Sequence, residues 1–135
     1  MENRYPTSKL LEVLFVRALA EQMNKEAHAS ERVILNMVNP GFCKTSLSRD
    51  AKGLMWLMFT LMKLFIGRTA EVGSRTLLAS AIGGPETHGK YMSECVVKEP
   101  SEFVRSAEGQ KTQERVYNEL MEILEKIQPG ITKNV

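Results

Sequence analysis

The sequence predicts an α/β fold in which a parallel sheet is covered by helices on both faces. Three observations predict it: residues 5–29 carry apolar side chains at helical spacing, residues 33–39 form a short apolar run, and a Pro-Gly turn ends that run. A short, non-alternating apolar strand that follows a helix is typical of a buried parallel sheet. The chain has 135 residues, 43% of them hydrophobic, which predicts a single domain over 1–135.

The first predicted helix, residues 5–29, carries two apolar stripes, one of them through Leu11, Leu14 and Ala18. Pro6 is compatible with this helix because the first helical turn leaves its N–H groups without partners, so no hydrogen bond is lost. A helix with two apolar faces is expected to be buried on two sides.

The first predicted strand, residues 33–39, reads VILNMVN and is rich in the β-branched side chains that favour strands. Residues 51–67 follow as the most apolar segment of the chain, and we expect a helix packed on the protein. This segment is shorter than the about 20 residues that span a bilayer. The alternatives for residues 51–67 are a lid over an apolar substrate and a weak association with a membrane surface.

Two more helices and one more strand complete the predicted pattern of about two strands and four to five helices. Thr69 is expected to cap a helix over residues 70–82, which the Gly83-Gly84-Pro85 sequence ends. Residues 89–98 are rich in β-forming side chains and predict the second strand. The C-terminal helix, residues 108–128, has a one-sided apolar stripe.

Composition excludes several classes of function. The formal charge is +2, with both signs mixed along the chain, so no nucleic-acid partner is expected. Cys43 and Cys95 form neither a disulfide framework nor a metal motif, which favours a reduced, cytoplasmic setting and no metal. No export signal, GxSxG turn or P-loop occurs. His28 and His88 lie in turn-like sequence and are expected to be ordinary surface side chains.

A tyrosine and a lysine four residues apart, Tyr5 and Lys9, mark the start of the first helix. Side chains at positions i and i+4 lie on the same face of a helix, so the ammonium can sit beside the phenol. A neighbouring ammonium lowers the pKa of a phenol from about 10 toward the working pH. Such a pair is suited to general acid and base catalysis.

The YPTSK sequence at residues 5–9, followed by a strand that ends in NPGFCKT, resembles the C-terminal half of the short-chain dehydrogenase/reductase family. The later GKYMSECVVKEPSEFVRSAEG sequence is similar to fungal members of that family. The resemblance covers essentially the whole chain, and it is specific because the separate elements occur in the family's order. It implies that the chain holds the last two strands of an incomplete, Rossmann-like, doubly wound parallel sheet.

The resemblance also implies an NAD- or NADP-dependent oxidoreductase that acts on a carbonyl or secondary alcohol of an apolar substrate, with a role in fungal secondary metabolism. Tyr5 takes the position of the acid/base that exchanges a proton with the substrate. Lys9 takes the position of the lysine that activates the tyrosine and binds the nicotinamide ribose. Pro40, Gly41 and Thr45 correspond to residues that line the nicotinamide site.

Some parts of the family's pattern are not found in this sequence. The glycines are scattered and none forms the glycine-rich turn that holds the cofactor pyrophosphate, and the catalytic serine and asparagine have no counterpart. We therefore expect the N-terminal, cofactor-binding half to be missing and some apolar surface to be exposed. The alternative function is that of a truncated pseudoenzyme, an interaction module that forms a homo-oligomer or binds a complementing chain through helix 5–29.

Overall fold

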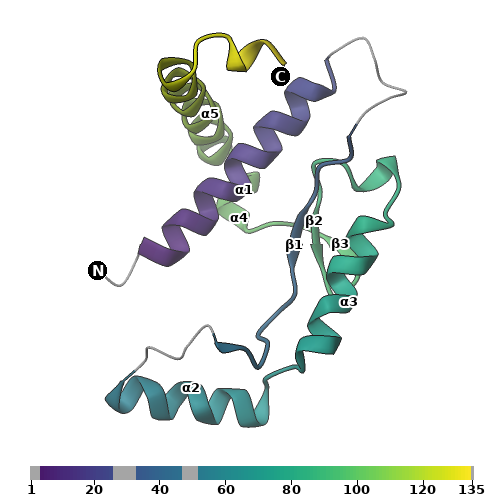
Figure 1. The fold of residues 1–135 in the computed structure, drawn as a ribbon, viewed down its shortest axis with the longest axis vertical. Coiled ribbons are helices and arrows are strands. Elements are labelled where there is room, and N and C mark those ends of the chain that lie inside the picture. Colours follow the sequence, from purple (N-terminus) through teal and green to yellow (C-terminus); the bar gives the residue numbers. More distant parts are fainter. Residues whose placement is uncertain (1–3, 26–32, 47–51, 135) are drawn as a thin grey trace. The chain divides into compact units, whose positions relative to one another are not determined.

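The computed structural model (Figure 1) describes the parts of the chain that comprise residues 4–25, 33–46 and 52–134. Within these residues there are five α-helices and a three-stranded mixed sheet of order β1-β2-β3. The predicted α/β class is therefore confirmed, but the sheet is mixed rather than parallel and contains one strand more than the sequence predicts. None of the described helices is both long enough and apolar enough to cross a membrane.

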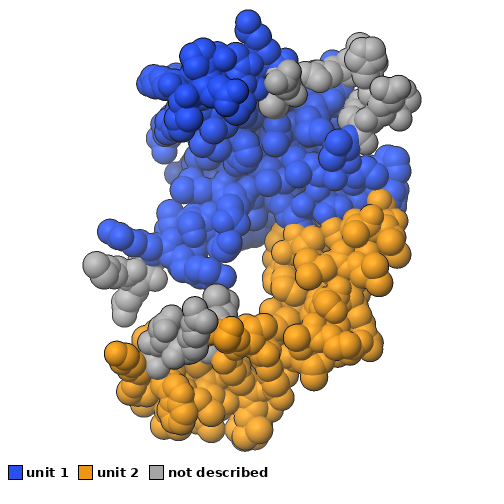
Figure 2. Space-filling model, in the orientation of Figure 1, with its two compact units in different colours: residues 1–37, 84–90, 99–135 blue, residues 38–83, 91–98 orange. Residues whose placement is uncertain are grey.

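The contacts within the chain divide it into two compact units, which Figure 2 colours blue and orange. Unit 1 comprises residues 1–37, 84–90 and 99–135. Unit 2 comprises residues 38–83 and 91–98. The sequence predicts one domain, whereas each of these units has its own set of internal contacts.

Unit 1 is built on two long helices, α1 (Arg4–Met23) and α5 (Ala107–Ile127), which pack against each other. Leu14 of α1 is fully buried, and the rings of Phe15 and Tyr117 stack with their centroids 6.0 Å apart. The remaining elements of unit 1 are three short helices: η3 (Pro85–Thr87), α4 (Glu102–Arg105) and η4 (Ile131–Asn134).

Helix α1 differs from its prediction at its C-terminal end and in its burial. It ends at Met23 and is followed by a turn at Asn24 and Lys25, whereas residues 26–29 lie outside the described residues. Asparagine favours turns because its side chain competes for backbone hydrogen bonds. The expected burial holds in part: Leu14 and Ala18 of one stripe and Ala20 of the other are buried, whereas Leu11 is 44% exposed and residues 4–9 are all exposed.

Strand β1 (Met37–Asn39) is shorter than the predicted strand 33–39. The N–H of Leu35 donates to Nδ1 of His88 and the carbonyl of Leu35 accepts from the N–H of Gly89, so this residue bonds to a side chain and a turn. Residues 33–36 consequently lie outside the strand that begins at Met37. The prediction of a strand over residues 33–36 was wrong, because a strand needs a hydrogen-bonded neighbouring strand and the local sequence pattern does not specify one.

The predicted second strand, 89–98, is a hairpin of two antiparallel strands, β2 (Tyr91–Ser93) and β3 (Val96–Lys98). Glu94 and Cys95 form the connecting turn with φ angles of 56° and 64°. Two central residues with positive φ are the signature of a type I′ turn, in which Asn-Gly is the preferred sequence. Glu-Cys lacks that signal, so the prediction of one continuous strand was wrong.

Two helices of unit 2 occur close to where they are predicted. Helix α3 (Ala70–Ala81) is capped by Thr69, whose hydroxyl accepts a hydrogen bond from the N–H of Val72 at 3.2 Å, which confirms the predicted cap. Helix α2 (Gly53–Phe65) lies within the apolar segment, but none of its residues is buried. The expectation that this helix packs on the protein is therefore wrong for the chain described.

Candidate active site

The predicted acid/base pair lies in the first turns of α1, in unit 1. Tyr5 is 61% exposed, and the Nζ atom of Lys9 is 5.8 Å from the centroid of the Tyr5 ring. The helix begins at Arg4, so Pro6 occupies the first turn, where its ring costs no hydrogen bond. The helical spacing therefore brings the ammonium and the phenol ring to one exposed face, at a distance that permits a cation–π contact.

Glu12 is a third member of this group that the sequence analysis missed. Both carboxylate oxygens of Glu12 accept hydrogen bonds from Nζ of Lys9, at 2.8 and 2.9 Å. The hydrogen bonds that Lys9 donates to Glu12 raise the pKa of its ammonium, and the nearby Tyr5 acts in the same direction. The signal in the sequence is an acidic residue three positions after a lysine on the same helical face.

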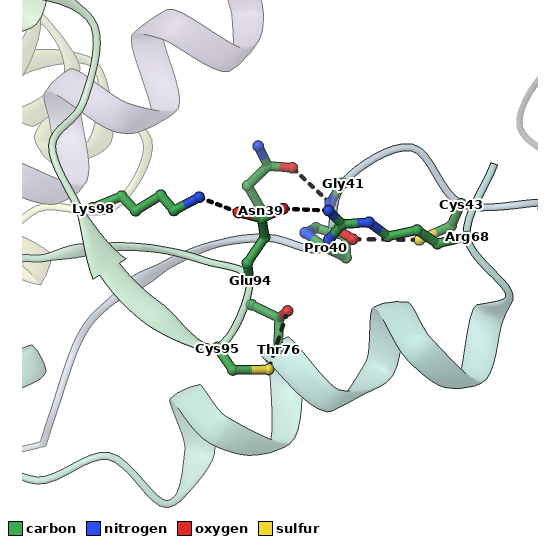
Figure 3. A network of polar contacts seen from close by, with 9 residues as sticks. All are labelled: Asn39, Pro40, Gly41, Cys43, Arg68, Thr76, Glu94, Cys95 and Lys98. Atoms are coloured by element: carbon green, nitrogen blue, oxygen red, sulfur yellow. Dashed lines mark hydrogen bonds and ion pairs between the residues drawn. The ribbon is translucent and has the colours of Figure 1, made fainter. Parts of the chain in front are cut away.

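The second predicted group lies at the Pro-Gly turn that follows β1, in unit 2 (Figure 3). The N–H of Gly41 donates to Oδ1 of Asn39 at 2.9 Å, and Gly41 has a φ of +78°. Nδ2 of Asn39 donates to the hydroxyl of Tyr91 on β2 at 2.7 Å. Asn39 therefore links the start of the turn to the neighbouring strand. The left-handed conformation at Gly41 is one that glycine adopts without strain.

The rest of this turn contacts Gly73 of α3 and accepts one hydrogen bond from Lys63 of α2. The thiol of Cys43 lies 3.5 Å from the carbonyl oxygen of Pro40 and contacts α3 at Gly73, where an added Cβ would approach the sulfur to 2.3 Å. The N–H of Thr45 donates to the carbonyl of Cys43, and the carbonyl of Thr45 accepts from Nζ of Lys63 at 2.8 Å. The side chain of Cys43 and the main chain of Thr45 thus hold the segment, and Thr45 is an exposed residue.

An ion-pair network lies beside the turn and is visible in Figure 3. Glu94 accepts hydrogen bonds from Lys98 through one carboxylate oxygen and from Arg68 through the other. The hydrogen bond from Lys98 has the largest effect, that from Arg68 the next, and together these cations lower the pKa of the Glu94 carboxyl to about 2. The carboxylate is therefore charged at neutral pH and joins the cations on both sides of it.

The structure thus assembles the predicted site residues in two groups. Tyr5 and Lys9 are neighbours in unit 1, whereas Pro40, Gly41 and Thr45 belong to one turn of unit 2. No cluster of three or more His, Cys, Asp or Glu side chains suited to a metal ion occurs in the parts of the chain that the structure describes.

Comparison with known proteins finds relatives over nearly the whole chain. The short chain dehydrogenase/reductase dmxR8 of Cryptosporiopsis sp. (strain 8999) is 47% identical over 133 residues, which make up 98% of this chain and 39% of that relative. The short-chain dehydrogenase anuD of Penicillium roqueforti (strain FM164) is 41% identical over 134 residues, or 97% of this chain and 35% of the relative. The short chain dehydrogenase FGM9 of Gibberella zeae is 35% identical over 131 residues, or 97% and 38%.

The chain therefore spans less than two fifths of the length of these three relatives. No family model and no solved structure matches it.

Proposed function

Because the chain belongs to the short-chain dehydrogenase/reductase family, we propose that it provides the proton-transfer pair and part of the nicotinamide site of an NAD(P)-dependent oxidoreductase. The substrate of this reaction is a carbonyl or secondary alcohol of an apolar molecule. The observation that carries the proposal is the position of the Lys9 ammonium, 5.8 Å from the ring centroid of Tyr5, on an exposed helical face. We also propose that β1 and β2 belong to a larger, Rossmann-like, doubly wound parallel sheet, to which β3 adds an antiparallel strand.

In this proposal Tyr5 donates a proton to the carbonyl oxygen, or removes one from the alcohol in the reverse direction. Lys9 places its positive charge beside the phenol of Tyr5 and donates hydrogen bonds to ribose hydroxyls. The bound cofactor supplies or accepts the hydride. The residues present fit these roles, since the side chains of Tyr5 and Lys9 are more than half exposed and are therefore accessible to ligands.

At the Pro-Gly turn, the proposed contacts to the nicotinamide end involve Pro40, Gly41 and Thr45. The turn is suited to these contacts because its backbone is fixed at Gly41, whose N–H donates to Oδ1 of Asn39. The Thr45 side chain is exposed, and its hydroxyl is able to donate or accept a hydrogen bond with a carboxamide.

Further parts of the proposal concern the setting of the enzyme. We propose a role in fungal secondary metabolism and a cytoplasmic location, the latter supported by two free cysteines, Cys43 and Cys95. We propose that helix 5–29 contributes to a homo-oligomer or binds a complementing chain, because Leu11 exposes an apolar side chain on it. Segment 51–67 would cover the apolar substrate or associate weakly with a membrane surface, because α2 exposes apolar side chains along its length.

Titration of the purified chain with NADH and NADPH, followed by cofactor fluorescence, tests the proposal. We expect saturable binding that Lys9→Ala weakens and Tyr5→Phe leaves intact. In a carbonyl-reduction assay, Tyr5→Phe should lower kcat by at least about 100-fold, because a general acid contributes that much or more. Tyr117→Phe is the matched control, since its ring stacks on Phe15 away from the pair and it should leave both properties unchanged.

A chain that binds neither cofactor nor substrate would contradict this function and favour the alternative, a non-catalytic interaction module. Activity that survives in Tyr5→Phe would contradict the assignment of Tyr5 alone.

A further inference from the structure

Arg68 holds the segment that contains the Pro-Gly turn, residues 40–45, which we call the Pro-Gly loop. The N–H of Arg68 donates to the carbonyl of Phe42 at 2.9 Å, and the carbonyl of Arg68 accepts from the N–H of Lys44 at 2.8 Å. These two hydrogen bonds form a short parallel bridge between Cys43 and Arg68. The main chain of Arg68 therefore binds the middle of the Pro-Gly loop.

The side chain of Arg68 binds the same loop at a second place. Its guanidinium lies against Gly41, where a Cβ atom would be 3.3 Å from Nη1 and 3.4 Å from Cζ. The absence of a side chain at Gly41 thus leaves room for the guanidinium, in addition to allowing the positive φ of this residue. Arg68 therefore contacts the loop at Gly41 through its side chain and at Phe42 and Lys44 through its main chain.

The guanidinium is held in turn by Glu94, which lies 26 residues further along the chain. Glu94 also binds Lys98, and it belongs to the tight turn of the β2–β3 hairpin. The next residue, Cys95, has its sulfur 3.7 Å from the hydroxyl of Thr76 on α3 (Figure 3). The hairpin turn that carries this carboxylate therefore belongs to the sheet and also contacts helix α3 through Cys95.

We propose that Arg68, oriented by Glu94, is a positioning residue that fixes the Pro-Gly loop for binding of the nicotinamide end of the cofactor. This inference rests on the proposed function. The network is partly exposed, with side-chain accessibilities of 36% for Arg68 and 45% for Glu94, so its contribution to overall stability is small. Its effect is on the local position of Gly41 and Thr45, and small displacements of positioned groups reduce binding and catalysis.

The test compares NADH affinity among variants of the full chain. Arg68→Ala should weaken NADH binding about fivefold, which corresponds to the free energy that a partly exposed ion pair contributes. Arg68→Lys keeps the charge but loses the planar fork, so it should weaken binding to an intermediate extent. Glu94→Gln removes the charge that orients the guanidinium and should weaken NADH binding to about the same extent as Arg68→Ala. The control is Arg75→Ala, which breaks an exposed ion pair with Glu71 on α3 and should leave affinity unchanged.

Two further measurements separate positioning from a general structural role. Amide hydrogen exchange at Lys44 and Thr45 should become faster in Arg68→Ala, while the melting temperature should fall no further than in Arg75→Ala. A larger loss of melting temperature, or an NADH affinity that Glu94→Gln leaves unchanged, would overturn the assigned role. Unchanged NADH affinity in Arg68→Ala would overturn the role of Arg68 alone, whereas absence of NADH binding by the unsubstituted chain would overturn the cofactor site itself.

Discussion

The Nε atom of Arg17 on α1 donates a hydrogen bond of 3.1 Å to Oε1 of Gln113 on α5. Gln113 is only 3% exposed, and its Nε2 atom donates to the carboxylate of Glu21, also at 3.1 Å. Both ends of one buried amide are therefore bonded to α1, so that the helix pair of unit 1 contains a specific polar contact among its apolar contacts. Buried polar groups that are satisfied in this way fix the register of the helices that carry them.

Replacing Gln113 by alanine should lower the free energy of unfolding by about 1–3 kcal/mol, because Arg17 and Glu21 lose a partner in a partly buried setting. Urea unfolding monitored by circular dichroism measures the effect. Gln110→Ala, at an exposed position of the same helix, is the matched control and should be close to neutral. Equal stabilities of the two variants would contradict the importance of the buried amide.

His88 should occupy one tautomer in its neutral form. Nδ1 accepts a hydrogen bond from the N–H of Leu35, which leaves the proton on Nε2, and Nε2 lies 3.2 Å from the carbonyl oxygen of Ala20. Nitrogen-15 NMR of the ring should therefore report the Nε2–H form. His88→Ala should speed hydrogen exchange at the Leu35 amide about fivefold, whereas a proton found on Nδ1 would refute this geometry.

The ion pairs of Glu94 should depend on pH in a defined direction. Its carboxyl has a folded-state pKa of about 2, below the ordinary 4.5, so the stabilisation is complete above pH 4.5 and is lost as the pH falls toward 2. An NMR titration of the carboxyl carbon should have its midpoint near 2. Lys98→Met should raise that midpoint, whereas Arg75→Ala should not; an unshifted midpoint in Lys98→Met would argue against the pair.

Gly73 should not tolerate alanine, although alanine is normally the better helix former by about 1 kcal/mol. The added Cβ would approach Sγ of Cys43 to 2.3 Å, and overpacking of this kind costs about 1–3 kcal/mol. Thermal unfolding of Gly73→Ala should reveal the loss, with Ser74→Ala on the same helix as a control. Because the remaining neighbours are 3.6 Å away or more, Cys43→Ala should restore stability in the double variant; additive losses would disprove the contact.

Helices were predictable from the sequence because their signals are local. The cap at Thr69 and the stop at Gly83-Gly84-Pro85 place α3 within one residue of its observed end. The apolar segment 51–67 contains α2, and the one-sided apolar stripe places α5. Strands were less predictable because their hydrogen-bond partners are distant in sequence. In the segment 33–36, the N–H of Leu35 donates to the His88 ring and not to a neighbouring strand. The positive φ values at Glu94 and Cys95 occur at residues that are not typical of such turns.

The same distinction applies to the candidate site. Tyr5 and Lys9 come together because four residues make about one helical turn, which the sequence states directly. The bond between Asn39 and Tyr91 joins residues 52 positions apart, and the Arg68–Glu94 pair joins residues 26 apart. Such pairs depend on how strands and helices pack, so no spacing rule could have identified them.

The hairpin turn at Glu94 and Cys95 also bears on how this protein would respond to laboratory evolution. Asn-Gly suits a type I′ turn better than Glu-Cys, so a library selected for expression or heat resistance should converge on the substitutions Glu94→Asn and Cys95→Gly. Each step would remove a side chain that ties the turn to Arg68 or Thr76. Selection for thermal stability would thus remove the ion pair that joins the hairpin turn to Arg68, whereas selection for the proposed cofactor binding should retain it.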